Sequence, residues 1–362
     1  MEATEELAPA ADGGPPLQLA WGLGLRPAVQ NCVLALDDTT VLYPQGRTLA
    51  RLNVETNAMT FLSGGERGGL PVAVALAPSR KMVAVCEQRK GDGHPVIGLY
   101  DLAKTRRLRT LTYAANGSRF VSAAFSGDGK QLAAVSEAPD FHIVLWAVDK
   151  GRVEAMAKQP GLHTRVSFCP RDPQRTTALV CSGPRSLKLW TLVEDSRLKD
   201  TPIYVGKRSS EQPEYTDHCW WPVSGKASAA AKAAAKTSSS AAAATPIQPA
   251  TKADVQFSDA PMLCAVTASG TVLLFLDGQP DAHYELKQSL TLFAAHGDQT
   301  RPAPSAIRCL ACTRGFLVSA EKGLLALFER NATDGLFYQT RSFTCALPKA
   351  GVHSSTVRNI HI

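Results

Sequence analysis

Short apolar runs separated by turn residues recur along almost the whole chain. The clearest runs end in a strand whose aromatic or leucine side chain is flanked by apolar neighbours. These strands read TLARLNV at 48–54, VIGLYDL at 96–102, HIVLWAV at 142–148, SLKLWTL at 186–192, TVLLFLD at 271–277 and GLLALFER at 323–330. The recurrence predicts a repeat architecture built from strands.

The spacing of these strands indicates the kind of repeat. Aligning them gives one repeat position, occupied by Leu52, Tyr100, Trp146, Trp190, Phe275 and Phe328. The first four are 44–48 residues apart, which is the period of a four-stranded propeller blade. Trp190 and Phe275 are 85 residues apart, close to two periods.

The third unit shows the expected internal layout of a blade. Val121–Phe125 reads as a strand, and Ser126–Lys130 contains two glycines, which accept the backbone angles of a tight hairpin turn. Gln131–Ser136 and His142–Val148 follow as the second and third strands. We expect the other units to repeat this order.

Both faces of the predicted strands are apolar. In the strand at 142–148, Ile143 and Leu145 point to one side, whereas Val144 and Trp146 point to the other. Such strands belong to sheets that are covered on both faces, and stacked blades meet this requirement without helices. The sequence therefore predicts an all-β, WD40-like β-propeller of about six blades.

The final residues extend the pattern. Thr356–Ile362 aligns with the first strands at 121–125 and 307–311, so we expect it to be the first strand of a seventh blade. Two interpretations remain open. The chain is the first propeller of a longer protein, which we favour, or this strand closes against Leu17–Val29.

Composition divides the chain into three parts. We expect a disordered leader over residues 1–16 and a propeller over 17–362. Within the propeller, residues 224–253 form a low-complexity Ala/Ser/Lys insert without large apolar side chains. This insert accounts for the long spacing between Trp190 and Phe275.

Cysteine usage and the N-terminus bear on the cellular compartment. The chain has nine cysteines, an odd number, and an acidic start that is unlike a secretory signal. We therefore expect reduced thiols in a cytoplasmic, non-secreted protein. No apolar run approaches the roughly 20 residues that span a bilayer, so we expect no membrane contact. The net charge of +7 favours acidic partners in general, and we expect no nucleic acid among them.

No motif indicates catalysis or a cofactor. The chain lacks a nucleophile elbow, a phosphate-binding loop and kinase signatures, so we expect a non-enzyme with no cofactor, no catalytic residues and no metal ligands. Cys309 and Cys312 form a CxxC, but on a strand they face opposite sides, which favours core packing. Arg106, Arg107 and Arg109 form a basic cluster that is a candidate contact for an acidic partner.

The opening residues carry the most specific resemblance. Gly24-Leu25-Arg26, Val41-Leu42-Tyr43-Pro44 with Gly46, and Arg51-Leu52-Asn53-Val54 resemble the start of WD-repeat propellers in the family of cilia- and flagella-associated protein 57. The Trp-Asp dipeptide of WD repeats is nearly absent, since only Tyr100-Asp101 keeps the acid. A second propeller and a coiled coil of that family are not part of this sequence.

The resemblance implies a scaffold of the ciliary or flagellar axoneme, part of the cytoskeleton. It would make protein–protein contacts with axonemal proteins, including inner dynein arm subunits and doublet-microtubule-associated proteins, and so support motility. Two alternatives remain. One is a generic cytosolic WD-repeat adaptor. The other is a propeller with a ligand site in its channel, which needs polar residues on the innermost strands. Those at Val72–Ala77 and Val121–Phe125 are small and apolar.

Overall fold

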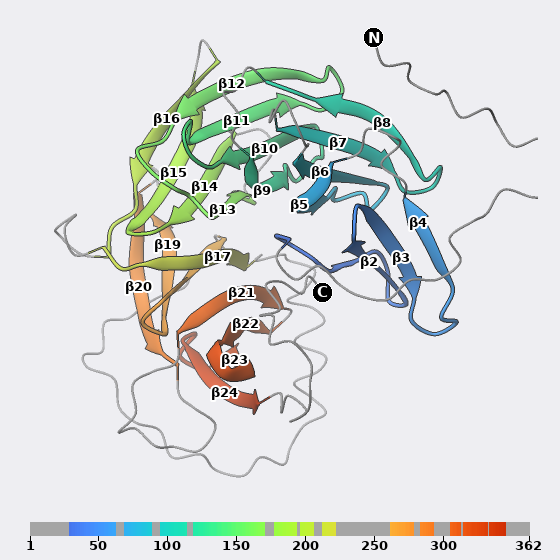
Figure 1. The fold of residues 1–362 in the computed structure, drawn as a ribbon. Coiled ribbons are helices and arrows are strands. Elements are labelled where there is room, and N and C mark those ends of the chain that lie inside the picture. The colour runs from blue at the N-terminus through green and yellow to red at the C-terminus, as the bar shows by residue number, and fades with distance from the viewer. Residues whose placement is uncertain are drawn as a thin grey trace, which may run out of the picture.

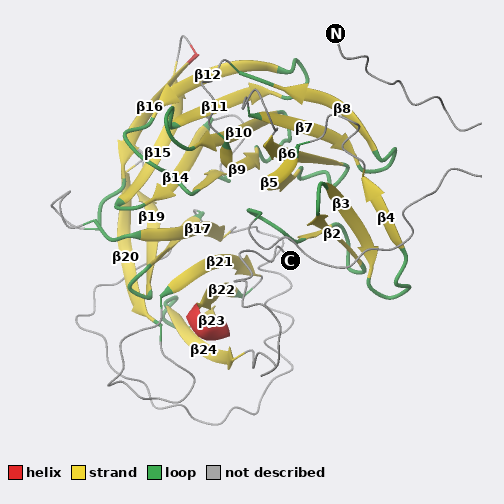
Figure 2. Ribbon diagram, in the orientation of Figure 1, coloured by secondary structure: helices red, strands yellow, loops and turns green. Residues whose placement is uncertain are grey.

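The fold is known from a computed structural model. The structure describes residues 29–62, 69–88, 95–113, 119–170, 177–193, 196–205, 212–221, 261–278, 283–292, 305–312, 314–331 and 333–344. These residues form six four-stranded antiparallel sheets that succeed one another in chain order around a central axis (Figure 1). Strands account for nearly all the regular structure (Figure 2). The predicted all-β propeller of about six blades is confirmed.

Each sheet is one blade, and its four strands pair in the order in which they occur along the chain. Blade 1 contains β1 Leu34–Ala35, β2 Thr40–Gln45, β3 Thr48–Asn53 and β4 Met59–Leu62. Blade 2 contains β5 Leu70–Leu76, β6 Met82–Gln88, β7 Val96–Asp101 and β8 Arg106–Leu111. Blade 3 contains β9 Phe120–Phe125, β10 Gln131–Ser136, β11 His142–Ala147 and β12 Arg152–Lys158.

The second half of the chain repeats the arrangement. Blade 4 contains β13 Arg165–Phe168, β14 Ala178–Gly183, β15 Ser186–Val193 and β16 Arg197–Pro202. Blade 5 contains β17 Tyr215–Trp221, β18 Met262–Thr267, β19 Thr271–Gly278 and β20 His283–Thr291. Blade 6 contains β21 Ala306–Cys312, β22 Gly315–Ala320, β23 Leu324–Arg330 and β24 Phe337–Thr344, with a short 3₁₀ turn, η3 Glu321–Gly323, before β23.

The hairpin between β9 and β10 shows why the local sequence folds as expected. The Ser126 hydroxyl donates to Asp128 at 2.6 Å and accepts the backbone N–H of Gln131 at 2.9 Å. Gly129 has a φ of +72°, which glycine adopts without the steric cost of a side chain. The turn therefore fixes the register in which Phe125 pairs with Leu132.

Apolar clusters join consecutive blades. One cluster lies between each of the blade pairs 1/2, 2/3, 3/4, 4/5 and 5/6. At the repeat position, the side chains from Tyr100 to Phe328 are at most 3% exposed, whereas Leu52 of blade 1 is half-buried. Burial of apolar side chains between neighbouring sheets therefore supplies most of the stabilisation that holds the blades together.

Several predictions fall on parts of the chain that the structure does not describe. The leader at 1–16, the insert at 224–253 and the strand at 356–362 lie outside the described residues. The division into these segments stays a prediction. Among the described residues, no helix has the length and apolar character needed to cross a membrane.

Candidate functional site

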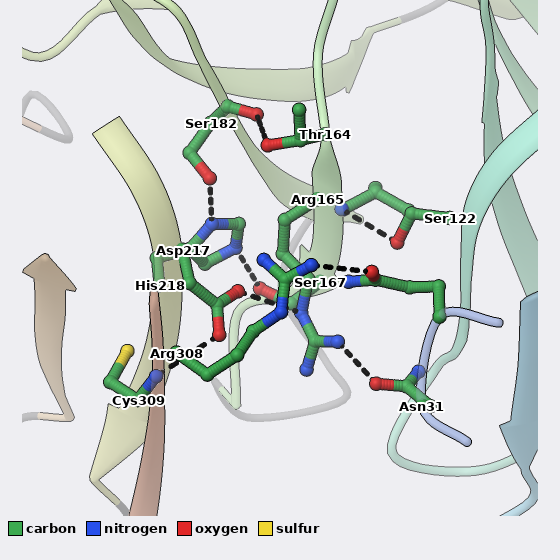
Figure 3. Close-up of polar contacts among 12 residues, drawn as sticks. Asn31, Ser122, Thr164, Arg165, Ser167, Ser182, Asp217, His218, Arg308 and Cys309 are labelled. Carbon is green, nitrogen blue, oxygen red and sulfur yellow. Dashed lines mark hydrogen bonds and ion pairs between the residues drawn. The ribbon is translucent and has the colours of Figure 1, made fainter. Parts of the chain in front are cut away.

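The innermost strands of blades 3 to 6 share one structural position that carries a polar side chain. In each of these blades, the repeat position on the third strand pairs with a residue of the second strand. That second-strand residue in turn pairs with one residue of the first strand. These first-strand residues are Phe125, Phe168, Trp220 and Ala311. Three residues earlier stand Ser122, Arg165, Asp217 and Arg308. We call these four residues the axial residues, because the first strands line the axis of the ring (Figure 1). Figure 3 shows the four side chains and their polar contacts.

The axial residues connect neighbouring blades. Ser122 Oγ accepts the backbone N–H of Val166 in the next blade at 3.2 Å. Asp217 Oδ2 accepts the N–H of Cys309 in the same relation at 3.1 Å. The other carboxylate oxygen of Asp217 lies 3.6 Å from Arg165 Nε. The same link therefore occurs twice, once with a neutral acceptor and once with a charged one.

The segment that precedes blade 1 also reaches the axis. The Gln30 backbone bonds to both Val72 and Val74 of β5, each at 3.0 Å. Its side-chain oxygen accepts Arg308 Nη2 at 2.9 Å. Asn31 accepts Arg165 Nη1 and donates to the Val74 carbonyl at 2.9 Å. Two residues from the start of the described chain thus contact blades 2, 4 and 6.

This network corrects part of the sequence analysis. β5 has the small apolar character that was expected of the innermost strands, and β9 has it apart from Ser122, but β13, β17 and β21 place two arginines and one buried aspartate at the axis. The Asp217 side chain is 0% exposed and that of Arg165 is 12% exposed. A buried charge is tolerated when it is paired and hydrogen-bonded, so the network holds strands together.

A serine and a histidine lie within hydrogen-bonding distance beside the axis. We therefore asked whether they could belong to a hydrolytic site. His218 Nε2 lies 2.7 Å from Ser167 Oγ, and Nδ1 lies 2.7 Å from Ser182 Oγ. Ser167 also accepts Trp220 Nε1 at 2.9 Å. A hydrolytic triad needs a carboxylate behind the histidine, and here that position is taken by Ser182. Burial, aided by the charge of Arg165, lowers the pKa of His218 well below its usual value. The arrangement is that of a structural hydrogen-bond chain.

Three cysteines meet in the core between blades 5 and 6. Cys219, Cys264 and Cys309 come from β17, β18 and β21, and their sulfur atoms lie within 4.8 Å of one another. Such a group could hold a soft metal ion only as thiolates. Burial raises the pKa of all three thiols well above the usual value, and the negative charge of Asp217 adds to the shift. These shifts favour neutral thiols, and Cys312 of the CxxC is not part of the cluster.

The predicted basic cluster lies on β8, the outer strand of blade 2. Arg106 and Arg109 are exposed, while Arg107 is half-buried. Arg107 forms an ion pair with the buried Glu87, and its guanidinium carbon lies 5.0 Å from the centre of the Tyr100 ring. Arg106 and Arg109 are thus presented to solvent, and Arg107 is engaged within its own blade.

The repeat-position side chains serve packing. Trp146 is 0% exposed and meets the Phe120 ring edge-on at 5.6 Å between centroids. Asp101, next to Tyr100, accepts the backbone N–H groups of Ala103 and Lys104 and so shapes the turn into β8. A small hollow between blades 1 and 2, lined by Leu49, Leu62 and Tyr100 among others, has room for about one water molecule.

Comparison with known proteins agrees with the sequence pattern. The chain is 27% identical over 202 residues to mouse cilia- and flagella-associated protein 57, covering 54% of this chain and 16% of that protein. It is 30% identical over 171 residues to cilia- and flagella-associated protein 44 of Trypanosoma brucei brucei, covering 47% and 9%. Mouse cilia- and flagella-associated protein 43 is 28% identical over 183 residues, covering 49% and 10%.

This chain is a WD-repeat-type propeller similar to the cilia- and flagella-associated proteins. It spans less than a fifth of the length of these curated relatives. No family model matches it. The propeller is also similar in structure to the β-propeller domain of Cps50 (Swd1) from Myceliophteria thermophila, with a TM-score of 0.53 and 11% identity, covering 77% of this chain and 74% of that one. That likeness concerns the fold alone.

Sequence reasoning missed the axial residues, although a signal was present. Each polar axial residue stands three positions before the first-strand residue in line with the repeat position, so aligning the first strands would have put Ser122, Arg165, Asp217 and Arg308 in one column. The cysteine cluster had no comparable signal, because its members come from three strands in two blades.

Proposed function

We propose that the protein is a non-enzymatic protein–protein interaction scaffold of the ciliary or flagellar axoneme, and that it helps to dock or position inner-arm dyneins on doublet microtubules. The observation that carries the proposal is the similarity to three cilia- and flagella-associated proteins along about half of this propeller. The small hollow between blades and the internally bonded axis fit a binding platform better than an enzyme.

The exposed part of β8 is the contact surface we propose for an acidic partner. Arg106 and Arg109 are solvent-exposed on an edge strand, and Leu108 between them is 49% exposed. Basic side chains on edge strands also prevent unwanted strand pairing, which is their function if no partner binds here. The proposal therefore predicts that their removal weakens binding without changing the fold.

Affinity capture tests this proposal. The tagged protein is expressed in ciliated cells, localised by fluorescence microscopy, captured after detergent extraction and analysed by mass spectrometry. We expect signal in cilia and enrichment of inner-arm dynein subunits. The Arg106→Ala/Arg109→Ala double variant should reduce that enrichment several-fold, whereas a matched Arg152→Ala/Lys158→Ala variant on exposed positions of β12 should not.

One other outcome would contradict the whole proposal, and a second would contradict its contact surface. Capture of a soluble complex without axonemal components would favour a generic cytosolic WD-repeat adaptor. Equal enrichment with both double variants would retain the scaffold but remove β8 as its contact surface.

A further inference from the structure

Three thiols from two blades converge in the apolar core between blades 5 and 6. Cys219 and Cys264 pair directly across β17 and β18, and Cys309 lies on β21 of the next blade. Their sulfur atoms lie within 4.8 Å of one another, and the three residues are 8%, 0% and 5% exposed. We call this group the thiol cluster. It includes none of the axial residues, and the scaffold function proposed above makes no use of it.

The backbone holds the three sulfur atoms together. The pairing of β17 with β18 fixes Cys219 opposite Cys264, and the Cys309 N–H donates to Asp217 Oδ2, two residues before Cys219, at 3.1 Å. Each thiol hydrogen-bonds to the other two, and Cys309 Sγ also lies 3.8 Å from the Cys264 carbonyl oxygen. A ligand that takes three sulfur atoms therefore finds them already grouped, so binding needs little rearrangement.

The spacing of the sulfur atoms suits a three-coordinate ligand. Three sulfur atoms bound to one central atom at about 2.3 Å lie about 4 Å from one another. The 4.8 Å limit of the thiol cluster is close to that spacing. Among the described residues, no histidine, carboxylate or further cysteine joins the group, so the fourth ligand of a tetrahedral structural zinc site is not supplied.

The surroundings decide which central atom suits the site. The thiol cluster packs in one apolar core with Met262, Leu274 and Phe316, and a net charge in such a medium is costly. A Zn²⁺ ion on three thiolates leaves a net charge of −1, and Cu⁺ leaves −2. The negative charge of Asp217 nearby makes either result less favourable. A trivalent centre on three thiolates leaves no net charge.

We propose that the thiol cluster is a binding site for trivalent arsenic, which reaches it as arsenous acid, As(OH)₃. Three S–H bonds and three As–O bonds break, and three As–S bonds and three O–H bonds form, so that three water molecules leave. Arsenic stays trivalent, and no oxidant or reductant takes part. Neutral thiols and a neutral acid thus give a neutral product, which joins β17 and β18 of blade 5 to β21 of blade 6.

This neutral exchange also suits the acid–base state of the thiols. Burial raises the pKa of all three well above the usual value. A cation that leaves charge in the core has to overcome these shifts, whereas arsenic does not. The three residues are at most 8% exposed, so arsenous acid enters only when blades 5 and 6 separate locally, and binding is slow.

Native mass spectrometry of the reduced full chain, after long incubation with sodium arsenite, tests the site. We expect the protein to gain the mass of one arsenic atom minus that of three hydrogen atoms. Cys309→Ala should weaken binding by at least about 100-fold, because the third sulfur is an intramolecular ligand. Two controls should bind as the native protein does. They are Cys181→Ala, which removes a buried thiol of blade 4, and Cys312→Ala, which removes the other cysteine of the CxxC.

X-ray absorption at the arsenic edge gives a readout that needs no variant. We expect three sulfur neighbours and no oxygen neighbour in the arsenic complex of the native chain. Two sulfur neighbours and one oxygen, no uptake of arsenic by the folded chain, or uptake unchanged by Cys309→Ala would overturn the proposal. Tighter binding of Zn²⁺ than of arsenite at these cysteines would refute the charge argument and the proposal with it. If Cys309→Ala does not fold, the absorption spectrum of the native chain decides.

Discussion

Glu87 illustrates how a single charge is accommodated inside a blade. Its side chain is 2% exposed, and it accepts hydrogen bonds from Tyr100 Oη at 2.8 Å and from the Gly69 backbone at 2.9 Å, besides its ion pair with Arg107. Gly98 leaves the room for this group, since a Cβ there would lie 2.7 Å from the Glu87 carboxylate. Burial and the Glu87 charge raise the pKa of Tyr100 to about 12, so the phenol stays a donor.

Removing the cation should therefore be costly. Arg107→Ala leaves Glu87 buried without its counter-charge, and we expect the free energy of unfolding to fall by about 3–5 kcal/mol. Arg106→Ala, one residue away and exposed, should change it by no more than about 0.5 kcal/mol. Urea denaturation with an unchanged slope measures both values. Equal effects would show that the ion pair does not stabilise blade 2.

Two buried histidines predict how stability depends on pH. Burial lowers the pKa of His163 to about 4 and that of His218 well below its usual value. In the unfolded chain both titrate near 6.5, so below that pH the unfolded state binds protons that the folded state does not. Their contribution is complete above about pH 6.5 and is lost as the pH falls.

Between pH 7 and pH 5 we expect a loss of about 2 kcal/mol in unfolding free energy for each of these histidines. Chemical denaturation at several pH values measures it. His218→Gln should flatten the profile by about one histidine's share, whereas replacing an exposed lysine such as Lys130 should leave it unchanged. A His218→Gln profile as steep as that of the native protein would rule out this assignment.

At the scale of elements, the first strands of neighbouring blades are joined by hydrogen bonds from a backbone N–H to a side-chain oxygen. In one case the oxygen belongs to a serine, and in the other to an aspartate. Ser122 and Asp217 occupy equivalent positions and accept equivalent backbone N–H groups, but only Asp217 also neutralises an arginine. The structure thus provides an internal comparison between a neutral and a charged contact.

That comparison can be measured directly. Ser122→Ala should lower the unfolding free energy by about 0.5–1.5 kcal/mol, because one neutral hydrogen bond is lost. Asp217→Ala should cost about 3–5 kcal/mol, because it also leaves Arg165 without its counter-charge. Thermal and chemical unfolding of both variants give the difference. Similar losses would mean that Arg165 is adequately solvated in the channel.

The cysteine cluster between β17, β18 and β21 also yields a prediction. If the thiols are neutral core groups, dialysis against a strong chelator should leave the melting temperature within about 1 °C of the untreated protein, since no metal contributes folding energy. A drop of several degrees, restored by one equivalent of Zn²⁺ or Cu⁺, would show that the cluster holds a metal.

At the scale of the whole molecule, the repeat could be predicted because blade geometry imposes a local period. The third-strand side chains of Tyr100, Trp146 and Trp190 recur at that period, and those at all five repeat positions from Tyr100 to Phe328 are buried, as expected. The axial charges were missed because only the ring brings Arg165, Asp217 and Arg308 together, and because the long connection between β17 and β18 separates the strands of blade 5. Ion pairs between blades do not affect the spacing of apolar residues within one blade, so the repeat pattern does not reveal them.

Gln30 and Arg308 form a hydrogen bond across 278 residues of sequence. During synthesis at about 5–20 residues per second, the Gln30 side chain waits roughly 15–55 s for its partner to leave the ribosome. Blades 2 and 4 supply the earlier contacts at Val74 and Arg165, so the start of the described chain can be held in place while later blades are made. Ring closure through this bond therefore comes after blades 2 to 5 have been made, and the unclosed ring, with its apolar faces uncovered, is the species on which chaperones would act.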